Sequence, residues 1–156
     1  MAEVWDERQL AADGFEHVYA ELDWYDGPRS GLVGIGGAPH YFQCHDVDFS
    51  VAPDEYFVWP ADEKLVALER EQWAVFVEWN QRHEEGSAGI DRDPGQGGVD
   101  ARYDELTAVL TPYRQAPADA QLLVAEWRYD GGEPYRADGV YYWVRWHKAR
   151  DAQASS

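Results

Sequence analysis

Hydrophobic and polar residues alternate along the first third of the chain, as they do in β-strands that bury one face. Residues 15–25 show this alternation most clearly, and two shorter runs follow at 31–36 and 38–44. The Gly36-Gly37 pair between the two runs favours a tight hairpin, because glycine adopts the positive φ angles that such turns need. The pattern therefore predicts a three-stranded antiparallel meander.

A helical period replaces the alternation between residues 62 and 84. Apolar residues recur there at spacings typical of one helix face, which comprises Leu65, Leu68, Val75, Phe76 and Trp79. Asp62 is suited to the N-cap position, and Gly86 is suited to end the helix. A second, shorter helix is predicted at 101–110, with Asp100 as its N-cap.

The remaining segments complete the predicted fold. A short strand is expected near 55–59, and two runs at 121–129 and 139–147 predict a long hairpin joined through Asp130-Gly131-Gly132. Because hairpins dominate and the helices come in one block, the pattern favours the α+β class. We expect an antiparallel sheet of about five to six strands, covered on one face by two helices.

The length of 156 residues is typical of one domain with its own core. We therefore expect residues 1–156 to form a single α+β domain. A short helix is predicted at 3–12, but its apolar spacing is poor, so residues 1–14 are expected to be peripheral. The tail 149–156 is expected to fray.

The charge of the chain is strongly negative and unevenly distributed. The formal net charge is −17, and residues 1–63 alone carry 14 Asp and Glu residues against two Arg, a net charge of −12. Such a surface repels phosphate groups and attracts basic surfaces, so we expect no direct binding of nucleic acid. The aromatic content of 15% indicates a packed domain rather than a solvated acidic tail.

The sequence also predicts the compartment. Cys44 is the only cysteine, which fits a reducing environment. The N-terminal residues lack the basic and apolar stretches of a signal peptide, and no apolar run is long enough to span a membrane. We therefore expect a cytoplasmic protein without membrane association. Eleven Arg against two Lys is typical of a GC-rich bacterial genome.

Two short motifs resemble those of a small uncharacterised bacterial family. The first is the turn Tyr25-Asp26-Gly27-Pro28, and the second is the strand Pro39-His40-Tyr41-Phe42. The resemblance covers roughly residues 22–85. It implies an α+β domain and no particular activity.

A metal site is not expected from the spacing of the candidate ligands. On a strand, His40, Cys44 and Asp46 would share one face, while His45 would point to the other. Zinc needs three or four ligands fixed in tetrahedral geometry, and the chain has no second Cys or His pair at zinc-finger spacing. No nucleophile motif occurs, so the sequence predicts no metal and no cofactor and leaves catalysis open.

The leading hypothesis is an acidic protein-binding or inhibitory module, comparable to immunity proteins, antitoxins or nucleic-acid mimics. Its acids would steer a basic protein partner towards a surface on which aromatic rings supply contact area. The residues expected at this surface are Glu21, Asp23, Tyr25, Asp26, Arg29, Tyr41, Asp46 and Asp48.

The alternative hypothesis is a small-ligand-binding protein or an enzyme with an aromatic pocket between the sheet and helix 62–84. Aromatic pockets with a few converging polar groups are the usual form of a ligand site. The residues expected to line this pocket are Trp24, His40, Trp73, Glu126, Trp127 and Trp143.

Overall fold

The computed structural model describes residues 4–24, 27–45 and 54–148. The first half of this part contains β1 (Val4–Trp5), α1 (Glu7–Ala12), β2 (Glu16–Trp24), β3 (Pro28–Ile35), β4 (Ala38–Cys44), β5 (Glu55–Pro60) and α2 (Glu63–Glu84). The second half contains the 3₁₀ turns η1 (Ile90–Arg92) and η2 (Pro94–Gln96), α3 (Ala101–Leu110), η3 (Thr111–Arg114), β6 (Gln121–Asp130), β7 (Tyr135–Arg136), β8 (Gly139–Val140) and β9 (Tyr142–Lys148).

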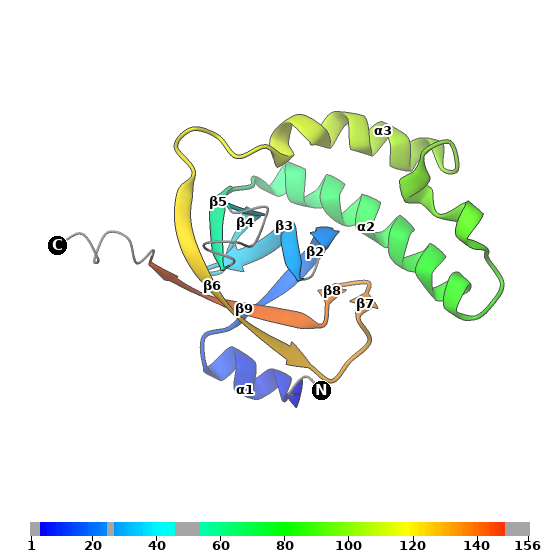
Figure 1. Ribbon diagram of the computed structural model, residues 1–156. Helices are drawn as coiled ribbons and strands as arrows, with labels where there is room; N and C mark the ends of the chain where they lie inside the picture. The colour runs from blue at the N-terminus through cyan, green and yellow to red at the C-terminus, as the bar shows by residue number, and fades with distance from the viewer. Residues whose placement is uncertain (1–3, 25–26, 46–53, 149–156) are drawn as a thin grey trace.

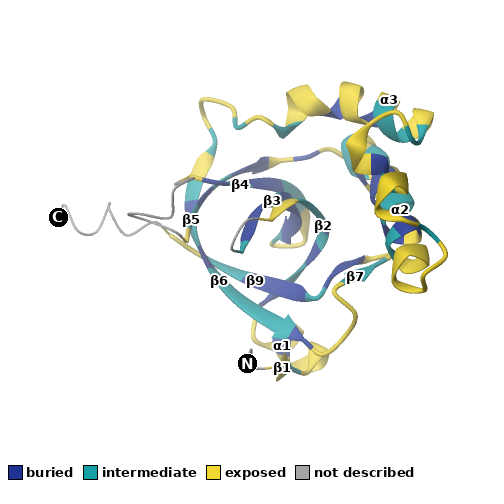
Figure 2. Ribbon diagram, turned by 45° about the vertical axis from the view of Figure 1, so that its right-hand side comes forward, coloured by how far each residue is buried: buried dark blue, intermediate teal, exposed yellow. Residues whose placement is uncertain are grey.

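The strands form a closed barrel rather than an open sheet (Figures 1 and 2). Neighbouring strands pair in the order β6-β5-β4-β3-β2-β9, all antiparallel, and β9 pairs again with β6. β1 adds to β6 in parallel, outside the closed ring. The α+β class and the antiparallel sheet are thus confirmed, but the expected open sheet with one covered face is wrong, because six strands close on themselves.

The helices lie on different sides of the barrel. Figure 2 shows α2 and α3 together against one side, with α1 and β1 against another. Three α-helices occur in the described residues: the short helix predicted at 3–12 forms as α1, although only two helices were expected to cover the sheet. α1 was missed as a covering element because one residue, Leu10, anchors it in a small second core with Phe15 and Trp143.

Aromatic rings from non-adjacent strands meet inside the barrel. Phe42 on β4 lies 6.1 Å from Trp146 on β9, ring centre to ring centre, although β4 pairs only with β3 and β5. Tyr56 on β5 and Trp127 on β6 pack against the same two rings at 5.7 to 6.2 Å. Most of these pairs meet edge to face or tilted, the geometry that aromatic quadrupoles favour.

The outer face of the barrel wall is also buried where α2 covers it. Tyr41 precedes Phe42 on β4 and so points outwards, where it stacks on Trp59 and donates a hydrogen bond to Glu69 of α2. Both Tyr41 and Phe42 are only 1% exposed. A strand that is buried on two faces loses the simple alternation that the sequence pattern relied on.

The predicted helix limits agree with the structure because local signals set them. The Asp62 side chain accepts a hydrogen bond from the Leu65 backbone N–H at 2.8 Å, and Asp100 accepts one from Tyr103 at 2.9 Å. Each carboxylate thereby satisfies a backbone donor that the first helical turn leaves unpaired. The predicted hairpin of residues 121–147 also forms, with the small β7–β8 ribbon inserted at its turn.

A buried carboxylate fixes the end of β6 against β9 and β7. Asp130 is 2% exposed and accepts hydrogen bonds from Arg136, from the Trp143 indole and from the Gly132 backbone, each at 2.8 Å. Burial alone would raise the pKa of Asp130, but these three donors hold it below its ordinary value of 3.8. The charged form of Asp130 therefore stabilises the folded state.

We predict that Asp130→Asn lowers the free energy of unfolding at pH 7 by about 2 kcal/mol, because three donors lose a charged acceptor. The folded-state pKa is depressed, so this stabilisation is complete above the unfolded-state pKa and is lost as the pH falls through the folded value. Urea denaturation of both proteins at pH 7, 5 and 3 should show the difference narrowing at acid pH. A difference that is constant or grows towards pH 3 would contradict the assignment, and exposed Asp119→Asn is the control.

Gly31 allows β2, β3 and β4 to approach one another closely. A Cβ atom at this position would lie 2.4 Å from the Ala20 backbone oxygen and 2.9 Å from the Phe42 ring. Gly34 on the same strand is different, because its Cβ would meet only the ends of the Glu16 and Tyr19 side chains. Backbone atoms in a closed barrel cannot move aside as side-chain ends can.

We predict that Gly31→Ala destabilises the protein by about 1–3 kcal/mol, the usual range for overpacking a core. Gly34→Ala should cost clearly less, since rotation of two side chains relieves the contact. Thermal or urea denaturation of the two variants checks this. Equal losses of stability in the two variants would show that the close backbone contact at Gly31 is not the cause of the destabilisation.

Candidate functional site between β2 and helix α2

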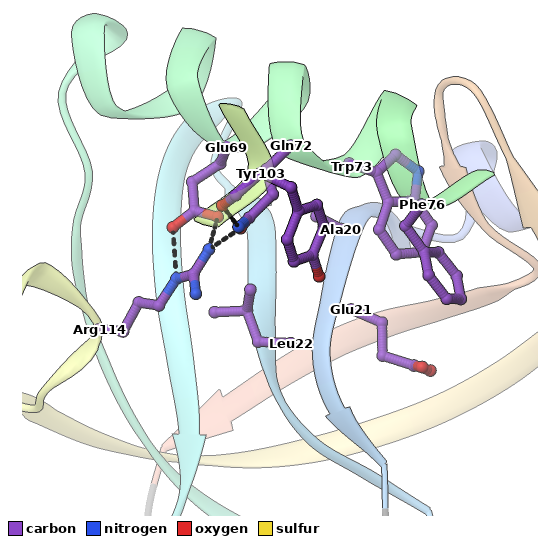
Figure 3. Close-up of a pocket in the computed structure, with 9 residues that line it drawn as sticks. All are labelled: Ala20, Glu21, Leu22, Glu69, Gln72, Trp73, Phe76, Tyr103 and Arg114. Carbon is purple, nitrogen blue, oxygen red and sulfur yellow. Dashed lines mark hydrogen bonds and ion pairs between the residues drawn. The ribbon is translucent and has the colours of Figure 1, made fainter. Parts of the chain in front are cut away.

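A cavity of about 170 Å³ lies between the outer face of β2 and the helical layer (Figure 3). Ala20 and Leu22 of β2 line its base. Trp73 and Phe76 of α2 form one wall. The cavity is therefore bounded on two sides by one strand of the barrel and by the helix that packs across it.

Polar groups gather at the other end of this cavity. Glu69 and Gln72 come from α2, Tyr103 comes from α3, and Arg114 comes from η3. On α2, the residues Glu69, Gln72, Trp73 and Phe76 are spaced by three, one and three positions, so they share one helix face. One face of a single helix thus supplies both the aromatic wall and part of the polar end.

An ion pair dominates the polar end. The Glu69 side chain is 1% exposed and the Arg114 side chain 18%. Arg114 donates from Nε to Glu69 Oε2 at 2.9 Å and from Nη2 to Oε1 at 2.7 Å. The Tyr41 hydroxyl also donates to Oε2 at 2.8 Å. A buried charge is tolerated when it is paired and hydrogen-bonded in this way.

Gln72 holds the same guanidinium group in place. Its side-chain Nε2 donates to the Tyr103 carbonyl oxygen at 3.0 Å and to the Thr107 hydroxyl at 2.7 Å. These two bonds orient the Gln72 amide so that its oxygen accepts a further bond from Arg114 Nη2. Nε and Nη2 of Arg114 are therefore occupied, whereas Nη1 has no hydrogen bond to another described residue.

Two tyrosines of the site remain un-ionised over the physiological pH range. Burial raises the pKa of Tyr41 far above its ordinary value, and the neighbouring Glu69 carboxylate raises it further. Burial also raises the pKa of Tyr103, whose ring lines the cavity. Both phenols therefore act as hydrogen-bond donors rather than as bases.

Glu21 lies at the edge of the cavity with its carboxylate turned away from Arg114 (Figure 3). The hydroxyl groups of Tyr135 and Tyr142 each donate to it at 3.0 Å. Burial raises the pKa of Glu21, although the two hydroxyl donors act in the opposite direction. Glu21 is thus engaged with the β7 and β9 side of the molecule.

The structure describes four of the eight residues expected at an acidic binding surface, and two of these four are buried. Asp23 is exposed and Glu21 is half-buried, bonded to two tyrosines. Tyr41 and Arg29 are 1% and 7% exposed, so neither is available as a surface contact; Arg29 donates to the sulfur of Cys44 inside the molecule. The remaining four residues lie outside the described part of the chain, namely Tyr25, Asp26, Asp46 and Asp48.

The residues expected to line an aromatic pocket do not share one cavity. Trp73 lines the cavity beneath α2, but Trp127 packs inside the barrel, and the Trp24 ring lies tilted against Tyr142 at 5.5 Å between ring centres. Trp143 packs on the side where α1 lies. Alternation along a strand assigns its residues to two faces, but it does not show which face points into a closed barrel and which points outwards.

The two polar residues of that set also lie elsewhere. Glu126 is on the outside of β6, where it accepts from Arg128, Arg145 and His147. His40 lines a separate groove beside Trp59 and Pro60. The pocket between sheet and helix therefore exists, but its polar groups are Glu69, Gln72, Tyr103 and Arg114, which were not predicted. One feature of the sequence could have indicated this polar end: Glu69 and Gln72 are polar residues on the otherwise apolar face of α2.

The chain matches no protein-family model, no curated protein and no solved structure with which it was compared. The resemblance of its two short motifs to a bacterial family stays a prediction. None of the described helices is both long enough and apolar enough to cross a bilayer. Across residues 4–24, 27–45 and 54–148, no three His, Cys, Asp or Glu side chains are grouped so that they could hold a metal ion.

We predict that Arg114→Gln destabilises the protein by about 3 kcal/mol, because Glu69 is left as a buried charge without its cation. Adding Glu69→Gln to this variant should recover most of the loss, since two amides can bond without a charge. Arg102→Gln breaks the exposed pair with Glu71 and should have a much smaller effect. Urea denaturation of the four proteins checks the order, and an Arg114→Gln effect no larger than that of Arg102→Gln would contradict it.

Proposed function

We propose that this protein binds a small organic molecule in the cavity between β2 and α2. The observation that carries the proposal is the guanidinium group of Arg114, which Glu69 and Gln72 hold in place while its Nη1 stays available, in a cavity whose other end is an aromatic wall. Ligand sites typically combine apolar and aromatic walls with a few fixed polar groups. The fixed orientation of Arg114 reduces the entropy that a ligand must overcome on binding.

The volume of the cavity sets the size of the ligand. At about 170 Å³, the space is similar to an engineered cavity of about 150 Å³ that binds benzene. The molecule that fits is therefore of single-ring size, or the single-ring part of a longer compound.

Binding fits the described groups better than catalysis. A general base needs an oxygen or nitrogen that can take a proton from the substrate. Both oxygens of Glu69 already accept bonds from Arg114 or Tyr41, and the Glu21 carboxylate faces its two tyrosines. The cavity can thus hold a molecule, while its carboxylates are engaged in keeping the walls in position.

The positions of the acidic residues also favour small-molecule binding over an acidic docking surface. Asp6 and Asp62 cap different helices, and Glu16 accepts hydrogen bonds from the Gly36 and Gly37 backbone at the β3–β4 turn. These carboxylates occupy local structural roles in separate parts of the fold. The basic-partner hypothesis stays a prediction that rests on the net charge of −17.

The test is a titration of ¹⁵N-labelled protein with a library of single-ring compounds, followed at the indole N–H of Trp73. This N–H donates to the Arg136 carbonyl oxygen at 2.7 Å, and its ring lines the cavity. We expect saturable shifts of this resonance with at least one compound. Leu22→Trp should fill the base of the cavity and weaken binding by more than about tenfold.

The matched control for that variant is Val109→Trp, which adds the same indole to an exposed position of α3. It should bind as the unmodified protein does, and circular dichroism shows whether both variants keep the fold. The proposal fails if no compound shifts the Trp73 resonance, or if Leu22→Trp leaves the affinity unchanged.

A further inference from the structure

We propose that the ligand of this cavity is uncharged and presents a hydrogen-bond acceptor, such as an amide or ketone oxygen, to Nη1 of Arg114. The flat apolar part of the molecule would then lie against Trp73 and Phe76. This inference rests on the proposed binding function and assigns it a ligand class.

The first step concerns the donors at the polar end. The guanidinium group carries five N–H bonds, and those of Nε and Nη2 point to Glu69 and Gln72. Figure 3 shows the third nitrogen of Arg114 directed away from Glu69, on the side where Leu22 lies. The Tyr103 side chain lines the same cavity, and its hydroxyl makes no hydrogen bond to another described residue. Nη1 of Arg114 can only donate and the Tyr103 hydroxyl can donate as well as accept, so an acceptor on the ligand suits both groups.

The second step concerns charge. Glu69 lies within 2.9 Å of two guanidinium nitrogens and cancels the positive charge of Arg114. A carboxylate ligand would gain the Arg114 bond but would approach Glu69 within a protein whose net charge is −17. An ammonium ligand would face the cationic edge of the guanidinium group. An uncharged acceptor gains the hydrogen bond without either repulsion.

The third step concerns the opposite wall. The Trp73 indole N–H is already used by the Arg136 carbonyl oxygen, so this side chain offers only its ring surface to a ligand. Phe76 lies beside it at 5.4 Å between ring centres, and Tyr135 packs edge-on against both rings. Neighbouring rings thus hold the wall in place, and it suits a planar apolar group.

The test compares three probes that share one ring and differ in charge, namely benzamide, benzoate and benzylamine. Titration at pH 7 should give benzamide the highest affinity, by about tenfold over both charged probes. If benzoate or benzylamine binds best to the unmodified protein, the uncharged class is wrong while binding at the cavity stands. If none of the three shifts the Trp73 resonance and the single-ring library does not either, the proposed function itself fails and this inference with it.

A charge-changing variant makes the test specific to the ion pair. Glu69→Gln keeps an acceptor for Arg114 but removes the carboxylate that offsets its charge, so benzoate should gain more than about tenfold and overtake benzamide. Glu71→Gln removes the same charge at an exposed position of α2, outside the cavity lining, and should leave the ranking unchanged. An unaltered ranking in Glu69→Gln, or an equal change in Glu71→Gln, would overturn the argument from charge cancellation.

Discussion

Closure of the sheet is the constraint on which the other features depend. β6 pairs with β5 through Gln121–Val124 and with β9 through Leu123–Tyr129, so both sides of this strand are engaged. A closed sheet removes exposed edges but creates an interior that side chains must fill. Aromatic rings from four strands fill it here, which gives the high aromatic content of the chain a structural role.

Because aromatic side chains fill the interior of the barrel, the helices pack on the outer face of its strands. The contact between the helices and the barrel is partly polar. Glu69 of α2 accepts hydrogen bonds from Tyr41 of β4 and from Arg114 of η3. This polar junction fixes the position of the helix at one end, and the rings of Trp73 and Phe76 fix it at the other. The cavity is the space between these two anchors.

The sequence predicted those elements whose signals are local. The caps Asp62 and Asp100 and the turn at Gly36-Gly37 lie within a few residues of the groups they act on, so α2, α3 and the β3–β4 hairpin were placed correctly. Closure was not predicted, because it joins Glu16 to Val144. The site shows the same division: Trp73 was predicted, whereas Glu69 and Arg114, 45 positions apart, acquire a shared role only through the fold.

The pairing of β2 with β9 also bears on how the molecule is made. β9 is the last described strand, and it completes hydrogen bonding for β2 and β6 alike. On the ribosome, the first barrel strands emerge well before their final neighbour exists. Until β9 emerges, β2 and β6 each present unpaired backbone groups to other chains, so the nascent polypeptide is open to aggregation over that interval.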